Sequence, residues 1–421
     1  MKLHDIAKQR FLFLQGPPGP FFDRLGGALR DLKHAVHRIN LNAGDAASWT
    51  GPAVDYRGTA ERWPCFVDDY IVQHAISDVI LFGDCRPLHN AARGMARLRG
   101  VRVHVFEEGY IRPNWATLEL DGVNGHSTLP RDPKWYLGAA RTLPPLADLP
   151  NVPSRFRRRA QEATSYYART SLGKLRFPNY RSHRDRSAAA EALGWLKQFA
   201  LRKLHEDQAE TAFARLEGRR YFTLPLQLSS DHQIRVHSLF GTMQAGASYV
   251  IESFARSAPT DTLLLVKEHP LDSSLFSWRH FIRREARRLD VEDRVIFAKG
   301  GSIADIVEGS LGVVTVNSTT GTLALASGVP VIALGQAVYN IPGITFDGPL
   351  DAFWSNPTPP DPKIWDAFSR VLQARCLVYG GFASDEGIEM LVQGSIARLV
   401  HASTMIIDLT KHIGNTAQAA E

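Results

Sequence analysis

Short apolar runs alternate with longer amphipathic segments through the first third of the chain, and the same pattern returns after residue 220. Apolar runs bounded by Gly, Pro or Asp predict buried strands, and the amphipathic stretches between them predict helices. The predicted strands are 10–14, 36–42, 79–83 and 101–106 in the first part, and 221–226, 263–268, 295–298, 312–316 and 331–334 in the second.

Strands that alternate with helices form parallel, doubly wound sheets, because each crossover helix covers one face of the sheet. We therefore predict an α/β protein of GT-B-like architecture, with two Rossmann-like doubly wound domains facing a central cleft, a helical connector and C-terminal helices. The predicted segments are an N-terminal Rossmann-like domain at 1–142, a basic helical connector at 143–216, a C-terminal Rossmann-like domain at 217–385, and a helix with a flexible tail at 386–421.

Composition narrows the classes of function. Hydrophobic residues make up 44% and charged residues 22% of the chain, as in ordinary soluble domains. The net charge of +6 favours acidic partners such as nucleotides or an anionic membrane surface, and no nucleic-acid motif is present. The three cysteines are far apart, so neither a disulfide framework nor a zinc site is expected. No apolar run approaches the roughly 20 residues that cross a bilayer.

A pair of hydroxyls follows the predicted strand 312–316. Asn317, Ser318 and Thr319 lead into a helix of small residues. Free N–H groups at a helix start, together with the hydroxyls, suit a phosphate group. The alternative is a plain helix cap, which Ser and Thr favour in any case.

The predicted strand 263–268 runs into a histidine. Lys267 and His269 flank its end, and Pro270 stops the strand. An imidazole at this edge of a parallel sheet can hydrogen-bond a phosphate oxygen or a leaving group. The alternative is a structural surface histidine, since the chain has fifteen of them.

Carboxylates complete the candidate site. Glu107 and Glu108 end the strand that begins at residue 101, and one of them is expected to face the cleft as a general base. Asp231 follows Gln227 at the opening of the second half, across the cleft. Two facing carboxylates suit glycosyl chemistry. The alternatives are a solvated loop end for the glutamates and a helix cap for Asp231.

Together these segments are more specific than any one alone. They are FLFLQGPPGPFF, RINLNAGD, LFGDCRP, FEEGYIRP, VNGHS, LQLSSDHQIRVHS, VKEHPLD, VNSTTG and GQAVYNIPG. Over most of its length the chain resembles the capsular polysaccharide Kdo transferases of the KpsS and KpsC type, and it looks like a KpsS-type member. Its carboxylate–carboxylate–Gly, His–Pro and paired-hydroxyl motifs are also similar to those of bacterial sialyltransferases, which use CMP-sugars.

The resemblance implies a retaining β-Kdo transferase. CMP-Kdo would be the donor, bound by the second domain, and a phosphatidylglycerol or lyso-phosphatidylglycerol lipid the acceptor, bound by the first. The product would start the poly-Kdo linker of a capsular polysaccharide. The resemblance also implies a cytoplasmic protein, peripheral at the inner face of the cytoplasmic membrane, with other capsule biosynthesis and export proteins as partners. No cofactor and no metal are expected.

The resemblance also implies residue roles. Asp231 would be the nucleophile and Glu107 or Glu108 the base. His269 and the Ser318–Thr319 pair would hold the CMP. The other implied contacts are Lys267, Asn317, Gln227 and Pro270 on the donor side, and Arg86, Arg112, Gln15 and Gly16 toward the acceptor or the Kdo carboxylate. The family's other branch has acidic residues before the Asp, where this chain has Ser229 and Ser230, so the position of the nucleophile stays open.

Two other functions remain in play. One is a GT-B enzyme or epimerase that uses a UDP- or ADP-sugar. The other is a non-catalytic factor that binds nucleotide or lipid and assists capsule assembly or export. For Arg86 and Arg112, structural salt bridging is an equal alternative to ligand contact.

Overall fold

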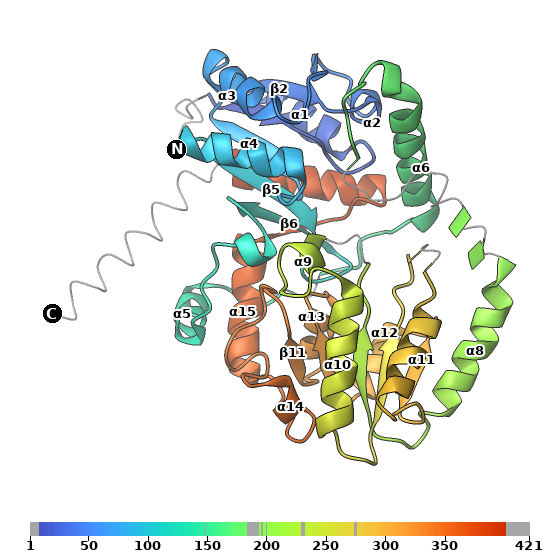
Figure 1. The fold of residues 1–421 in the computed structure, drawn as a ribbon. Coiled ribbons are helices and arrows are strands. Elements are labelled where there is room, and N and C mark those ends of the chain that lie inside the picture. Colours follow the sequence, from blue (N-terminus) through green and yellow to red (C-terminus); the bar gives the residue numbers. More distant parts are fainter. Residues whose placement is uncertain are drawn as a thin grey trace.

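The computed structural model describes residues 8–147, 149–182, 193–194, 197–198, 200–228, 232–272 and 276–400 of the 421-residue chain. Asp231 and the predicted tail beyond residue 400 lie outside the described residues. Two sheets stand one above the other, and each is flanked by helices (Figure 1). The predicted fold class is confirmed: an α/β chain with two mainly parallel sheets.

The first sheet has seven strands in the order β12-β6-β5-β4-β1-β2-β3. The strands from β3 to β5 pair in parallel, whereas β6 and β12 add an antiparallel edge. Their bounds are β1 Arg10–Phe13, β2 Ala35–Asn40, β3 Val54–Asp55, β4 Asp78–Phe82, β5 Arg102–Glu108, β6 Trp115–Leu120 and β12 Leu377–Tyr379. The helices of this half are α1 Phe21–Asp31, α2 Ala43–Ala47, α3 Trp63–Gln73 and α4 Pro87–Leu98.

The second sheet has five parallel strands in the order β11-β10-β7-β8-β9. They are β7 Tyr221–Pro225, β8 Leu263–Lys267, β9 Val295–Ala298, β10 Val313–Thr315 and β11 Val331–Ala333. The helices around it are α10 Met243–Ser257, α11 Trp278–Arg288, α12 Ile303–Glu308, α13 Thr320–Ala326 and α14 Leu350–Phe353. In each sheet the first strand of the half is an interior strand, with later strands added on both sides of it, as in Rossmann-like folds.

Further helices link the halves. They are η1 Asn124–His126, α5 Pro133–Ala139, η2 Ala140–Thr142, α6 Phe156–Leu172, η3 Gly173–Leu175, α8 Arg202–Ala214, α9 His232–Arg235 and α15 Pro362–Arg375. After α15 the chain returns to the first sheet as β12, and residues 385–400 form a helix there. Residues 377–379, which we predicted within the 217–385 segment, therefore belong to the first sheet.

Successive side chains of a strand point to opposite faces of the sheet, so each strand contributes to two different apolar cores. Leu12 of β1 and Leu14 just after it pack against α3 and α4, whereas Phe11 and Phe13 pack against α1 and the helix 385–400. In the second half Phe222 and Leu224 of β7 face α10, α11 and α14. Both faces of each parallel sheet are thus covered, which explains why the strands read as continuous apolar runs.

The apolar core of the first half continues into the second. One cluster of buried residues contains Tyr110 and Val123 of the first half together with Ala324 and Tyr339 of the second. A hydrogen bond of 2.7 Å from the Thr322 hydroxyl to the Tyr110 carbonyl oxygen crosses the same contact. Because this contact is apolar and buried, the halves pack as one body at this point.

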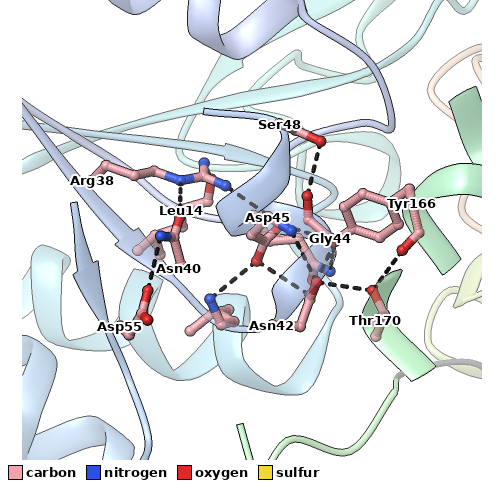
Figure 2. A network of polar contacts seen from close by, with 12 residues as sticks. Leu14, Arg38, Asn40, Asn42, Gly44, Asp45, Ser48, Asp55, Tyr166 and Thr170 are labelled. Carbon is pink, nitrogen blue, oxygen red and sulfur yellow. Dashed lines mark hydrogen bonds and ion pairs between the residues drawn. The ribbon is translucent and has the colours of Figure 1, made fainter. Parts of the chain in front are cut away.

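A buried polar network fastens helix α6 to the first half (Figure 2). The Tyr166 hydroxyl donates to Asp45 Oδ1 at 2.8 Å and accepts from Asn42 Nδ2 at 3.0 Å and Gln15 Nε2 at 2.6 Å. The Arg38 guanidinium lies 3.4 Å from Asp45 Oδ1. These partners compensate the cost of burying the Asp45 carboxylate, although burial still raises its pKa.

A glycine makes the contact with α6 possible. A Cβ at Gly44 would lie 2.7 Å from the Tyr166 carbonyl oxygen and 2.6 Å from Thr170 Oγ1. Asn42 caps α2 by accepting from Asp45 N at 3.0 Å and also accepts from Thr170 Oγ1 at 3.0 Å. The segment RINLNAGD is therefore explained by this anchor for the connector.

We expect Tyr166→Phe to destabilise the protein by about 1–3 kcal/mol, because it leaves buried partners of the hydroxyl without a hydrogen bond. Chemical denaturation followed by circular dichroism measures the change. Tyr249→Phe is the matched control, since Tyr249 is 45% exposed on α10 and should change stability by less than about 0.5 kcal/mol. Equal effects for the two variants would contradict the anchoring role of Tyr166.

Candidate active site between the two halves

In each sheet the chain begins at one interior strand and adds later strands on both sides of it. The position of that strand is the topological switch point of the sheet. In the first half β1 pairs with β2 on one side and β4 on the other, and in the second β7 lies between β8 and β10. Ligands of doubly wound proteins bind beyond the carboxyl ends of such strands. The residues found there are Gln15, Gly16, Gly83, Asp84, Cys85 and Arg86 in the first half, and Gln227, Asn317 and Ser318 in the second.

Glu107 and Glu108 point to different surroundings. Both lie within β5, so their side chains leave opposite faces of the strand. Glu108 forms an ion pair with Arg159 of α6. Glu107 lies toward the loop after β4, where a Cβ at Gly83 would be 3.2 Å from its Oε2. Glu107 is thus the carboxylate beside the switch-point loop, whereas Glu108 holds the connector.

Three further first-half candidates differ in environment. Arg86 lies over the Phe82 ring at 5.5 Å, and within the described part of the chain no ion pair occupies its guanidinium. Gln15 donates to the Tyr166 hydroxyl and, at 3.2 Å, to that of Tyr180. Gly16 is packed tightly, since a Cβ there would lie 2.7 Å from the Phe22 ring. Arg86 is the candidate whose charge is available to a ligand.

Two amide side chains, those of Gln227 and Asn317, hold the segment that follows β10 in the second half. Asn317 N donates to Gln227 Oε1 at 2.9 Å, and Asn317 Nδ2 donates to the His237 carbonyl oxygen at 2.9 Å. Both side chains are buried. Position 335 suits glycine, because a Cβ there would lie 2.5 Å from Asn317 Oδ1. This arrangement fixes where the chain leaves β10.

The paired hydroxyls lie just beyond that point. Ser318 Oγ accepts from Thr320 N and lies 3.1 Å from Thr320 Oγ1, so the protein itself uses this hydroxyl. Thr319 is the N-cap residue of α13 without a side-chain cap bond. Among the described residues, no hydrogen bond involves its hydroxyl. Thr319 is therefore the hydroxyl of the pair that a ligand can engage.

His269 is held as a hydrogen-bond donor. Its Nδ1 accepts from Leu271 N at 3.1 Å, so the neutral ring carries its proton on Nε2. Burial lowers the pKa of His269, the Asp272 carboxylate opposes this, and Arg112 adds to the lowering. Arg112, an exposed residue of the loop after β5, is thus close enough to act on His269 from the other half. Strands β8 and β10 lie two positions apart, or about 10 Å, so the loops that carry His269 and Thr319 leave the same edge of the sheet.

Lys267 and Pro270 frame this histidine differently. The Lys267 ammonium is buried, donates to the Glu268 carbonyl oxygen at 3.2 Å, and has its pKa lowered by burial. Pro270 is exposed in the turn after β8. Glu268 pairs with Lys299 at 3.1 Å.

Two cavities of about 330 and 200 Å³ lie along α8 and α11, and the second borders Glu268.

Sequence reasoning missed the residues that join the halves. Cys85 Sγ lies 3.2 Å from His237 Nε2, and His126 packs edge-on against His237. These residues stand in three of the quoted segments, LFGDCRP, VNGHS and LQLSSDHQIRVHS. Their occurrence in those segments was the signal by which the sequence marks them. Their spacing along the chain does not predict that their side chains lie in contact.

The two Rossmann-like halves, each with its own mainly parallel sheet, have a GT-B-like fold. No helix in the described part of the chain has the length and apolar character to span a bilayer.

The chain belongs to the family described as "Capsule polysaccharide biosynthesis protein", which matches residues 77–382. It is 32% identical over 379 residues to the capsule polysaccharide export protein KpsS of Escherichia coli, covering 89% of this chain and 96% of that protein. It is 35% identical over 374 residues to the capsule polysaccharide modification protein LipB of Neisseria meningitidis serogroup B, covering 86% and 88%. The resemblance to KpsS-type proteins is thereby confirmed.

Among solved structures, a β-Kdo 2,7 transferase of KpsC from Thermosulfurimonas dismutans aligns with a TM-score of 0.45 and 15% identity, covering 91% of this chain and 99% of that one.

We expect the His269 imidazole to titrate below its ordinary pKa of 6.5, because burial disfavours the charged ring. The measurement is the pH dependence of its carbon-13 ring resonance, identified by its loss in His269→Gln. A midpoint at or above 6.5 would contradict the lowering of the His269 pKa by burial.

Proposed function

We propose that the protein is a retaining β-Kdo transferase that moves Kdo from CMP-Kdo to a phosphatidylglycerol or lyso-phosphatidylglycerol lipid. The product starts the poly-Kdo linker of a capsular polysaccharide. The observation that carries the proposal is that Glu107 ends β5 in one half, while His269 and Thr319 follow the carboxyl ends of β8 and β10 in the other. The family's role in capsule polysaccharide biosynthesis supports it.

The donor side suits a nucleoside monophosphate as leaving group. A neutral His269 with its proton on Nε2, and the hydroxyl of Thr319, can each donate to a phosphate oxygen. These donors stabilise charge as the bond to CMP breaks. Gln227 and Asn317 fix the floor beneath the nucleotide, with Ser318 shaping the turn. A monophosphate carries less charge than a diphosphate, so this transfer needs no metal ion.

Retention follows from two displacements. The Asp231 carboxylate attacks the anomeric carbon, the C–O bond to CMP breaks, and CMP leaves with the electron pair. The acceptor hydroxyl then gives its proton to Glu107 and attacks the same carbon, which breaks the ester bond and frees Asp231. Arg86 and Arg112 bind the Kdo carboxylate or the lipid phosphate, since guanidinium groups suit both. Asp231 lies outside the described residues, so its role rests on the resemblance alone.

A corner of the connector suits an anionic membrane surface. Leu172 and Leu175 are 84% and 99% exposed at the end of α6 and in η3. Arg169 and Lys174 are exposed beside them and, within the described residues, make no ion pair. Apolar tips among unpaired cations match the chemistry of acidic lipid headgroups. We place the acceptor lipid on this side, at the inner face of the cytoplasmic membrane.

We expect the purified protein to release CMP from CMP-Kdo only when lyso-phosphatidylglycerol is present, with a β-linked Kdo lipid as product. Coupled detection of CMP and proton NMR of the product measure both. UDP-N-acetylglucosamine serves as the control donor. Thermal stabilisation by UDP but not by CMP would instead favour the UDP-sugar alternative. Binding of CMP without any turnover would favour a non-catalytic role in capsule assembly or export.

Glu107→Gln and Glu108→Gln separate the two carboxylates. We expect Glu107→Gln to lower kcat by about 10²–10⁴-fold at little changed KM for CMP-Kdo, because it removes the general base. Glu108→Gln loses an ion pair with Arg159 that is half-exposed, and should keep kcat within about tenfold. Thermal unfolding of both variants reports on folding. A larger loss in Glu108→Gln would reverse the assignment.

A further inference from the structure

Four potential metal ligands converge where the halves meet. Asp84 and Cys85 follow β4, His126 ends η1, and His237 lies between α9 and α10. One ligand atom from each lies within 4.8 Å of the others. Cys85 Sγ is 3.2 Å from His237 Nε2 and 4.0 Å from His126 Nδ1, and His126 Nδ1 is 2.8 Å from Asp84 Oδ2.

The cluster is enclosed. Asp84 and His237 are each 1% exposed, and Cys85 and His126 are half-buried. A buried carboxylate beside a thiol and two imidazoles is a costly arrangement unless a cation is shared among them. Arg93 supplies one such charge, at 2.9 Å from Asp84 Oδ2.

Neighbouring residues orient the ligands in the way that metal sites require. The Gln336 side chain hydrogen-bonds His237, which leaves Nε2 of that ring facing Cys85. Gly125 makes room, since a Cβ there would lie 2.4 Å from His237 Nδ1 and 2.5 Å from Gln336 Oε1. A second partner on the remote ring nitrogen is typical of a ligating histidine.

We propose that Asp84, Cys85, His126 and His237 bind one divalent transition metal ion of the zinc class. Zinc takes thiolate, imidazole and carboxylate ligands in a tetrahedron, whose bond lengths put the ligand atoms about 3.3–3.6 Å apart. Three of the distances, 2.8, 3.2 and 4.0 Å, bracket that spacing, and all of them lie within 4.8 Å. Magnesium and calcium prefer oxygen ligands and do not suit this set. The thiolate and the carboxylate together neutralise the ion.

The metal site is inferred from its own ligands and does not rest on the transferase activity. Asp84, Cys85 and His126 belong to the first half and His237 to the second, so the ion ties the halves together beside the candidate active site. It also revises the expectation from the sequence that no zinc site exists. That expectation rested on cysteine spacing, whereas this site uses a single cysteine.

Cobalt(II) is the probe for the full-length chain after removal of metal with a chelator. We expect one equivalent to produce a thiolate charge-transfer band and the intense visible bands of tetrahedral cobalt, both abolished by added zinc. Cys85→Ser should lose the charge-transfer band, and Cys65→Ser, which alters an exposed cysteine, should keep it. Absence of the band in the wild-type protein, or its survival in Cys85→Ser, would overturn the proposal in favour of a hydrogen-bonded cluster.

A second variant leaves all four ligands in place. Gln336→Ala removes only the partner of His237 and should weaken zinc affinity about 10–100-fold, measured by competition with a chromophoric chelator. His280→Asn, at an exposed position of α11, is the matched control and should leave the affinity unchanged. Zinc should also raise the melting temperature of the wild-type protein. Equal affinities in Gln336→Ala and His280→Asn would contradict the assignment of His237 as a ligand.

Discussion

The apolar contact between the halves is the constraint on which the site depends. A parallel sheet offers its ligand-binding loops at one edge only, so two sheets act on one ligand only if those edges face each other. Here Tyr110 of the first half packs in one buried cluster with Ala324 and Tyr339 of the second, and accepts a hydrogen bond from Thr322. The chain also crosses between the halves again after α15, when β12 joins the first sheet. These features fix the position of one sheet relative to the other.

Buried polar groups also hold particular loops of the first half in fixed positions. The Asp45 carboxylate is held by Arg38, Asn42 and Tyr166, and each of these contacts would be costly to leave half-made. Because Tyr166 belongs to α6, this network also positions Arg159 one to two turns earlier, where it pairs with Glu108. The connector is therefore part of the site's framework: it engages one glutamate and leaves the other facing the loop after β4.

The sequence predicted all nine strands that carry the site, because strands buried on both faces read as unbroken apolar runs. It missed β3, β6 and β12, which are short or lie at an antiparallel edge, and β12 pairs with a strand about 260 residues earlier, as no local pattern can show. The opposite directions of Glu107 and Glu108 followed from strand alternation. Which of them meets Arg159 depended on the tertiary position of α6, and so did the meeting of Cys85 with His237.

The loop after β4 lies beside Glu107 of the first half and also contacts His237 of the second. Gly83, with a φ of +72°, turns the chain beside Glu107, and Arg86 leaves on the same side. Cys85 faces the other way, toward His237 of the second half. Any movement of one half against the other therefore changes the Cys85–His237 contact and the position of Glu107 together. Since a displacement of about 1 Å in a reacting group can cost roughly a hundredfold in rate, an ion held at Cys85 and His237 would act on the chemistry without touching the substrate.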